Sequence, residues 1–156
     1  MAIKLWSGGN NRMSQGVVLM EQAVQPSSAP AKQVLIVDDE ITITWLLRET
    51  LEQLSNCQIW TAAGGEEALA LCETTSFDLI LTDYKMPGMD GLTLAGAIRH
   101  LQPHAVIVLL TGGSSEDICQ RASALAIRKI LNKPLRLSII RETILKIFTE
   151  MDQREV

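Results

Sequence analysis

The sequence has little cysteine and no excess of basic residues. Its three cysteines, Cys57, Cys72 and Cys119, are odd in number and widely spaced, so they form neither a disulfide framework nor a paired metal or redox motif. They are expected to be reduced, buried thiols of a cytoplasmic protein. The net charge of -4 at pH 7 provides no basic stripe that could displace the counterions of a nucleic acid. Direct binding to nucleic acid is therefore not expected.

Long hydrophobic runs are also missing. The apolar clusters, such as 34–37 and 106–110, are four to six residues long, whereas a membrane-spanning helix needs about 20 apolar residues. Near the N-terminus, the apolar stretch 17–20 is too short for the hydrophobic part of a signal peptide. We therefore expect a cytoplasmic protein that makes no contact with a membrane.

The composition that remains is globular, with 47% hydrophobic and 21% charged residues. Residues 1–31 are rich in Gly, Ser, Asn and Pro, and we interpret them as an extension or linker. Two alternatives stay open for this extension. It is either a flexible tail or an artefact of start-site choice, with Met13 or Met20 as the true start, or it is a partner-binding segment. Residues 32–150 are predicted to form one domain, followed by a tail at 151–156.

From residue 32 onward, apolar runs of strand length alternate with longer stretches whose apolar residues recur at helical spacing. This alternation is typical of strand–helix–strand units that build a parallel sheet. The fold class is therefore α/β, with five strands and five helices. The strands are expected at 33–37, 58–62, 77–82, 105–110 and 127–131, and the helices at 41–54, 66–72, 91–101, 114–125 and 135–149.

Several polar or aromatic residues in this pattern have a structural interpretation. Trp45 and Trp60 fall within apolar patterns and are expected to pack in the core. Ser114, with Asp117 three residues later, predicts the start of the fourth helix. His100 lies near the end of the third helix and is expected to complement the helix dipole. These residues are therefore not expected to carry the chemistry.

Two of the predicted strands end in acid. Asp38 and Asp39 follow the first strand, and Asp83 follows the third. Ligands of an open parallel sheet bind outside the carboxyl ends of its strands, so the three carboxylates meet if these strands are neighbours. They would repel one another without a cation, and an all-oxygen ligand set favours magnesium over zinc. The sequence therefore predicts a magnesium (Mg2+) site.

Thr111 and Lys133 follow the next two strands. Phosphoryl transfer requires an oxygen nucleophile, together with positive charge and hydrogen-bond donors around the phosphoryl oxygens. Asp83, magnesium, Thr111 and Lys133 would supply these groups. Each residue alone is weak evidence, because Asp, Thr and Lys at strand ends often serve in turns or at the surface. Their joint placement at one edge of the sheet indicates phosphoryl-transfer chemistry.

These motifs resemble those of the receiver domains of bacterial two-component response regulators. The resemblance covers about residues 32–149. It implies a flavodoxin-like, doubly wound five-stranded parallel sheet with strand order 2-1-3-4-5 and five helices. It also implies a phosphorylation-dependent switch that acts on no substrate but its own aspartate. The matching segments are Val34 to Glu40, Asp83 to Gly91, Thr111, and Lys133-Pro134.

Carried over residue by residue, the resemblance implies that Asp83 accepts the phosphoryl group. Asp38 and Asp39 would organise the magnesium ion, and the main-chain carbonyl of Lys85 would be a further ligand. Lys133 would pair with the acceptor and then with the phosphoryl oxygens. The implied partners are a histidine kinase or histidine phosphotransfer protein, a downstream effector protein and, after phosphorylation, a second copy of the chain.

The resemblance also assigns the switch and exposes departures from the family pattern. Thr111 would turn its hydroxyl toward the phosphoryl group, and Pro134 resembles the proline whose preceding bond is cis in the family. Ile130 stands where the family usually has a Tyr or Phe that turns inward as Thr111 moves. In the family, the side chains at Lys85 and Gly113 tune the phosphoryl lifetime, so we hypothesise that this lifetime is unusual.

Three alternatives remain open at this point. The chain could be a phosphorylation-independent adaptor, which Ile130 favours, or the receiver part of a hybrid histidine kinase. The third alternative is an aspartyl-phosphate phosphohydrolase. That activity needs a second acid two residues after the nucleophile, where Lys85 stands, and a cap insertion that the sequence does not contain.

Overall fold

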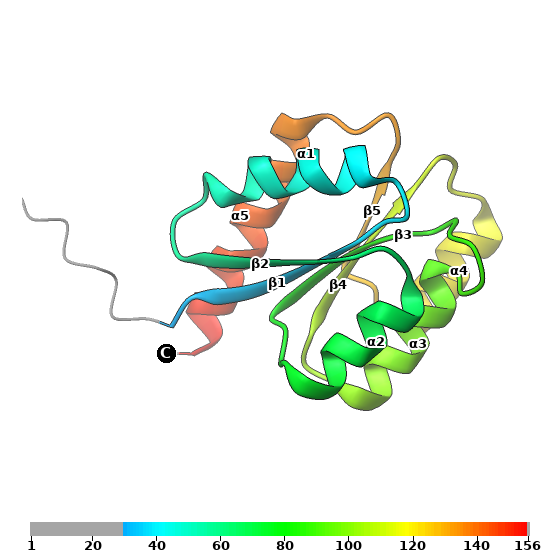
Figure 1. Ribbon diagram of the computed structural model, residues 1–156, viewed down its shortest axis with the longest axis horizontal. Coiled ribbons are helices and arrows are strands. Elements are labelled where there is room, and N and C mark those ends of the chain that lie inside the picture. The colour runs from blue at the N-terminus through cyan, green and yellow to red at the C-terminus, as the bar shows by residue number, and fades with distance from the viewer. Residues whose placement is uncertain (1–29, 156) are drawn as a thin grey trace, which may run out of the picture.

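The computed structural model describes residues 30–155, which form a five-stranded parallel sheet with helices on both faces (Figure 1). The strand order is β2-β1-β3-β4-β5, so the fold class and the order implied by the family resemblance are both confirmed. The strands are β1 (Lys32–Val37), β2 (Cys57–Ala62), β3 (Leu79–Asp83), β4 (Val106–Thr111) and β5 (Lys129–Asn132). The helices are α1 (Ile41–Glu52), α2 (Gly65–Thr74), α3 (Gly91–Leu101), α4 (Glu116–Ala124) and α5 (Leu137–Arg154).

Helices α1 and α5 cover one face of the sheet, and α2, α3 and α4 cover the other (Figure 1). The central strands β1, β3 and β4 are buried along most of their length. Their continuous apolar sequences are typical of parallel strands covered on both faces. Strands β2 and β5 form the edges of the sheet and are more exposed. The polar residues at the carboxyl ends of these buried strands are therefore the candidates for a functional site.

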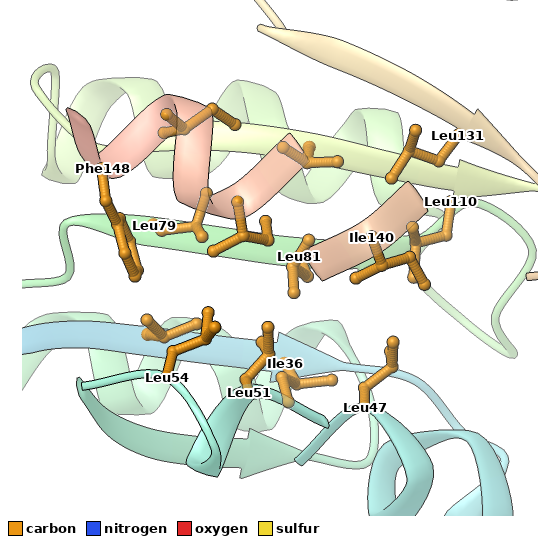
Figure 2. Close-up of a cluster of buried hydrophobic side chains, with 14 residues drawn as sticks. Ile36, Leu47, Leu51, Leu54, Leu79, Leu81, Leu110, Leu131, Ile140 and Phe148 are labelled. Atoms are coloured by element: carbon orange, nitrogen blue, oxygen red, sulfur yellow. The ribbon is translucent and has the colours of Figure 1, made fainter. Parts of the chain in front are cut away.

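The core under α1 and α5 fixes the position of the strand ends (Figure 2). Leu47 and Leu51 project from α1, Ile140 projects from α5, and both sets pack over Ile36 and Leu81 of the neighbouring strands β1 and β3. All five side chains are at most 1% exposed. Burying each of them contributes about 1.5–3 kcal/mol. This core holds β1 and β3 side by side, and with them the acids that follow each strand.

The last helix is longer than the sequence predicted. It continues to Arg154, so residues 151–154 are helical and not a tail. Met151 packs at the edge of the core, and Asp152 forms an ion pair of 2.9 Å with Lys32 at the start of β1. These contacts stabilise the additional turn. The predicted extension at 1–31 lies, except for its last two residues, outside the described part of the chain.

Two predictions about burial were wrong. Trp45 is 59% exposed, because α1 turns its Thr44 and Leu47 side to the sheet and Trp45 outward. Cys119 is exposed on α4, although Cys72 is buried as expected, and burial raises the pKa of the Cys72 thiol to about 11. Trp60 is half-buried and packs edge-on against a neighbouring phenylalanine ring.

The start of α4 also differs from the sequence prediction. The N-cap residue is Ser115 and not Ser114, and its side chain accepts a hydrogen bond from the main-chain N–H of Ile118. Both serines satisfy the sequence preference for an N-cap. Within the described residues, no helix is long and apolar enough to cross a membrane.

Candidate functional site

Three carboxylates meet where β1 and β3 end. Asp38 and Asp39 directly follow β1, and Asp83 is the last residue of β3. The register of the two strands pairs Val37 with Thr82, so the acids leave the sheet side by side. One carboxylate oxygen from each acid lies within 4.8 Å of the others. We call this group of three residues the acidic pocket.

The acids of this pocket differ in their exposure to solvent. Asp38 is 1% exposed and Asp83 is 5% exposed, whereas Asp39 is open to solvent. One oxygen of Asp38 accepts a hydrogen bond of 2.9 Å from the main-chain N–H of Glu40. The hydroxyl of the buried Thr44 lies within hydrogen-bond distance of the Asp38 and Glu40 carbonyl oxygens. Thr44 thus ties the first turn of α1 to the pocket.

Lys133 reaches the acidic pocket from the end of β5. Its ammonium nitrogen lies 3.1 Å from an oxygen of Asp83 and 3.3 Å from an oxygen of Asp38. Its main-chain N–H donates a 2.7 Å hydrogen bond to the carbonyl oxygen of Thr111, and its peptide bond to Pro134 is cis. The pocket therefore combines three negative charges with one fixed positive charge.

The electrostatics of the pocket push the pKa of Asp83 upward. Burial is the largest cause, the hydrogen bond from Lys133 opposes it, and the nearby charge of Asp38 adds to it, so the pKa is raised overall. Burial alone would lower the pKa of Lys133, but its hydrogen bond to Asp83 and the charges of both acids raise it overall. Lys133 is therefore a permanent cation, and Asp83 holds its charge against a desolvation penalty.

Thr111 ends β4 next to the pocket, and it is 2% exposed. Its hydroxyl donates a 3.0 Å hydrogen bond to the carbonyl oxygen of Gly113 and lies 3.3 Å from the main-chain N–H of the same residue. A Cβ atom added at Gly112 or Gly113 would meet no other atom within 4 Å. The hydroxyl is thus held by a loop that has room to rearrange.

Lys85 and Ile130 are the two remaining residues that the family resemblance singled out. Lys85 is exposed in the loop that follows β3. Ile130 of β5 is half-buried and packs with Tyr84 against a small apolar cluster under α4 that includes Leu109 and Ile118. The position of the usual family aromatic is therefore filled by an aliphatic side chain that connects the sheet to α4.

Two residues that hold the pocket were not found from the sequence. Thr44 carries no signal that separates it from other helix threonines. Gly91 begins α3, and a Cβ atom there would collide with the main-chain carbonyl oxygen of Asp83. Its N–H donates a 2.8 Å hydrogen bond to the carbonyl oxygen of Tyr84. The sequence includes Gly91 in the family motif, but only the structure gives the reason for glycine.

The donor set of the acidic pocket fits a magnesium ion. Its side-chain ligands are carboxylate oxygens, which hard divalent cations prefer, and one side of the pocket is open at Asp39 so that water can complete the coordination shell. Zinc sites usually contain nitrogen or sulfur ligands, and neither His nor Cys belongs to this cluster. The observed acids therefore agree with the ion predicted from the sequence.

Comparison with known proteins identifies the family. Residues 34–145 match the model of the response regulator receiver domain, and the chain belongs to this family. It is 33% identical to the probable chemotaxis protein CheY of Rhizobium etli, over 78% of this chain and 96% of that protein. It is also 32% identical to the virulence sensor protein BvgS of Bordetella bronchiseptica, but there the match spans only 11% of the relative.

Solved structures agree with this assignment. The chemotaxis response regulator CheY4 of Vibrio cholerae superposes with a TM-score of 0.70 at 31% identity, covering 75% of this chain and 98% of that one. A CheY-like receiver domain protein from Methanospirillum hungatei gives a TM-score of 0.75 at 27% identity, covering 80% of this chain and 98% of that chain. The fold and the acidic pocket are thus those of a receiver domain.

Proposed function

We propose that this chain is a phosphorylation-dependent switch of a two-component system or phosphorelay, and that Asp83 is its phospho-acceptor. The observation that carries the proposal is the contact of Asp83 with Lys133 beside two further acids. Asp83 is buried enough to be sheltered and still lies at the open end of β3. In the proposed reaction the phosphoryl group comes from a histidine kinase or a histidine phosphotransfer protein.

The chemistry follows from the groups around Asp83. A carboxylate oxygen of Asp83 forms the new P–O bond, the P–N bond to the donor imidazole breaks, and the imidazole keeps the bonding electron pair. Lys133 holds its positive charge against the phosphoryl oxygens, where negative charge builds up. The carboxylates of Asp38, Asp39 and Asp83 and the Lys85 carbonyl would hold magnesium, which when bound neutralises charge on the phosphoryl oxygens.

Readout of the phosphorylated state is assigned to Thr111. To reach a phosphoryl oxygen on Asp83, its hydroxyl must leave the Gly113 carbonyl that it now contacts. The movement would be passed to α4 through Ile130 and its apolar neighbours. An effector protein or a second copy of the chain would recognise the altered surface. The lack of a side chain at Gly113 and the exposed Lys85 side chain also support the hypothesis of an unusual phosphoryl lifetime.

The proposal is tested by phosphorylation in vitro. Acetyl phosphate with magnesium should add one phosphoryl group to the wild-type chain, and Asp83→Asn should abolish the addition because the nucleophile is lost. Intact-protein mass spectrometry measures the change. Asp117→Asn, at an exposed acid on α4 whose side chain is 75% exposed, is the matched control and should be modified like the wild type.

A wild-type chain whose mass stays unchanged under these conditions would contradict the proposed switch. That result would favour a phosphorylation-independent adaptor, an alternative that rests on Ile130 in place of the family aromatic. The similarity to part of BvgS supports a second context, in which this receiver works within a hybrid kinase. We further propose that the chain acts in the cytoplasm, where its phosphodonor would be found, and that it transforms no other substrate.

A further inference from the structure

A second group of charged residues lies far from the acidic pocket. It surrounds a hollow of about 340 Å³ whose lining includes Arg99, His104, Arg128 and Arg154. Within the described part of the chain, no acidic side chain lines it. The whole chain has a net charge of -4, so its composition does not predict a gathering of four basic residues. We call it the basic hollow.

The basic hollow lies at the opposite end of the sheet from the acidic pocket. Strand β4 begins at Val106, which lines the hollow, and ends at Thr111 beside the pocket. A strand rises about 3.3 Å per residue, so roughly 17 Å separate its two ends. The basic hollow is therefore not part of the predicted magnesium site.

Arg99 brings a positive charge to the hollow, and among residues 30–155 no carboxylate forms an ion pair with it. Its guanidinium donates hydrogen bonds to four main-chain carbonyl oxygens, those of Pro103, Ala105, Leu125 and Ala126, at 2.6 to 3.1 Å. Arg99 is half-buried, so its charge is partly desolvated, and this burial lowers its pKa. An anion would relieve this uncompensated charge, because opposite charge favours the ionised form.

The other basic residues are not equally available. Arg128 forms an ion pair with Glu150 on α5. Arg154 and His104 are exposed, and within the described residues neither forms an ion pair. Two basic side chains can therefore turn toward a ligand without breaking a contact, next to the fixed charge of Arg99.

An apolar surface adjoins the basic hollow. A neighbouring hollow of about 580 Å³ shares His104 and Arg154 with it and adds the apolar Phe77, Leu101 and Met151. Its lining also includes Lys32 and two acids, Asp78 and Glu155. Leu101 is 48% exposed, so its apolar side chain is accessible to a ligand in this hollow. Ligand sites commonly combine such apolar walls with a few polar groups that fix orientation, in volumes of about 300–1,000 Å³.

We propose that the basic hollow binds the phosphate group of a small phosphorylated molecule, whose flat or apolar body lies against Leu101; a mononucleotide is the simplest such ligand. Arginine guanidinium groups match phosphate oxygens in geometry and charge. The phosphate is assigned to the arginine end because Lys32, in the adjoining hollow, is already paired with Asp152 and Glu155. This site is independent of phosphorylation at Asp83.

The test is an NMR titration of the full ¹⁵N-labelled chain with adenosine monophosphate, in EDTA so that no magnesium complex forms at the acidic pocket. Saturable shifts are expected at the amides of Ala105, Ala126 and Arg154. Arg154→Gln should bind about tenfold more weakly, because a charge-assisted contact is lost. Arg141→Gln, at an exposed residue of the same helix outside the hollow, is the matched control and should bind like the wild type.

Two further ligands separate the contribution of the phosphate group from that of the nucleoside. Inorganic phosphate should shift the same amides at higher concentration, and adenosine alone should not. A wild-type chain without saturable shifts, shifts centred on Asp83, equal binding by Arg154→Gln, or adenosine binding as tightly as its monophosphate would each overturn the proposal. His104→Gln gives a second variant that should weaken binding and leave the fold intact, since His104 is exposed.

Discussion

At the scale of single residues, Asp83 combines a reactive position with an unfavourable environment. Its carboxylate is buried beside the negative charge of Asp38, and Lys133, together with a main-chain hydrogen bond from Tyr84, offsets these effects only in part. The pKa of Asp83 is higher in the folded chain than its ordinary value. Folding therefore favours the protonated form, and the free energy of unfolding falls as the pH rises from the ordinary Asp range through the folded pKa.

Asp83→Asn should therefore stabilise the magnesium-free chain at neutral pH. The expected gain in the free energy of unfolding is on the order of 1 kcal/mol, because the repulsion with Asp38 disappears while Lys133 keeps Asp38 as its partner. The gain should vanish when the pH falls below the ordinary Asp range, where Asp83 is protonated. Urea unfolding at neutral and acidic pH measures it.

The control for this prediction is Asp117→Asn, which removes an exposed carboxylate from the first turn of α4 and should bring no gain. Magnesium should stabilise the wild type more than Asp83→Asn, since an ion that binds only the folded chain raises its stability. A neutral-pH loss of stability in Asp83→Asn would contradict the view that Asp83 is strained by its surroundings.

At the scale of helices and strands, the contact between β3 and α3 depends on Gly91. A Cβ atom there would collide with the Asp83 carbonyl oxygen and lie 3.0 Å from a methyl carbon of Leu109. We expect Gly91→Ala to lower the free energy of unfolding by about 2 kcal/mol or more, since the Asp83 carbonyl belongs to the main chain and cannot yield as the Leu109 side chain can. Urea denaturation measures the loss.

Gly112→Ala is the matched control for this prediction. A Cβ atom at Gly112 meets nothing within 4 Å, so the substitution should change the free energy of unfolding by less than about 1 kcal/mol. If the two substitutions lowered the free energy of unfolding equally, the close approach of α3 to Asp83 would not be the reason for glycine at position 91.

Helix α1 offers a second test at this scale. Leu47→Ala should lower the free energy of unfolding by about 2–5 kcal/mol, because Leu47 is fully buried against the sheet. Trp45→Ala, two residues earlier, should cost less than about 1 kcal/mol. Thermal or chemical denaturation compares the two variants. A larger loss for Trp45→Ala would mean that the tryptophan packs in the core, as the sequence first suggested.

At the scale of the whole molecule, most of the architecture was readable from the sequence. Buried strands such as β1 and β4 appear in the sequence as short apolar runs. The acids that follow two of the strands predicted a site at one edge of the sheet. The neighbour relation of β1 and β3, on which the acidic pocket depends, came from the family resemblance, because periodicity does not report which strands pair.

Details set by tertiary contacts were not predictable. Trp45 was misplaced because three consecutive apolar residues of α1, Trp45 to Leu47, leave the direction of the buried face ambiguous. The end of α5 depends on an ion pair with Lys32, more than 100 residues away in the chain. The basic hollow is likewise built from separate segments, which are the end of α3, the start of β4, the turns after α3 and α4, and the end of α5.

The pairing of Lys133 with Asp38 joins residues 95 positions apart. During synthesis, the first acids of the pocket therefore emerge from the ribosome long before the lysine that balances their charge. Because domains generally fold as units, a nascent chain lacking β5 has the nucleophile without its cation. Under the proposed function, the chain would become able to accept a phosphoryl group only after translation has passed β5 and this last strand has joined the sheet.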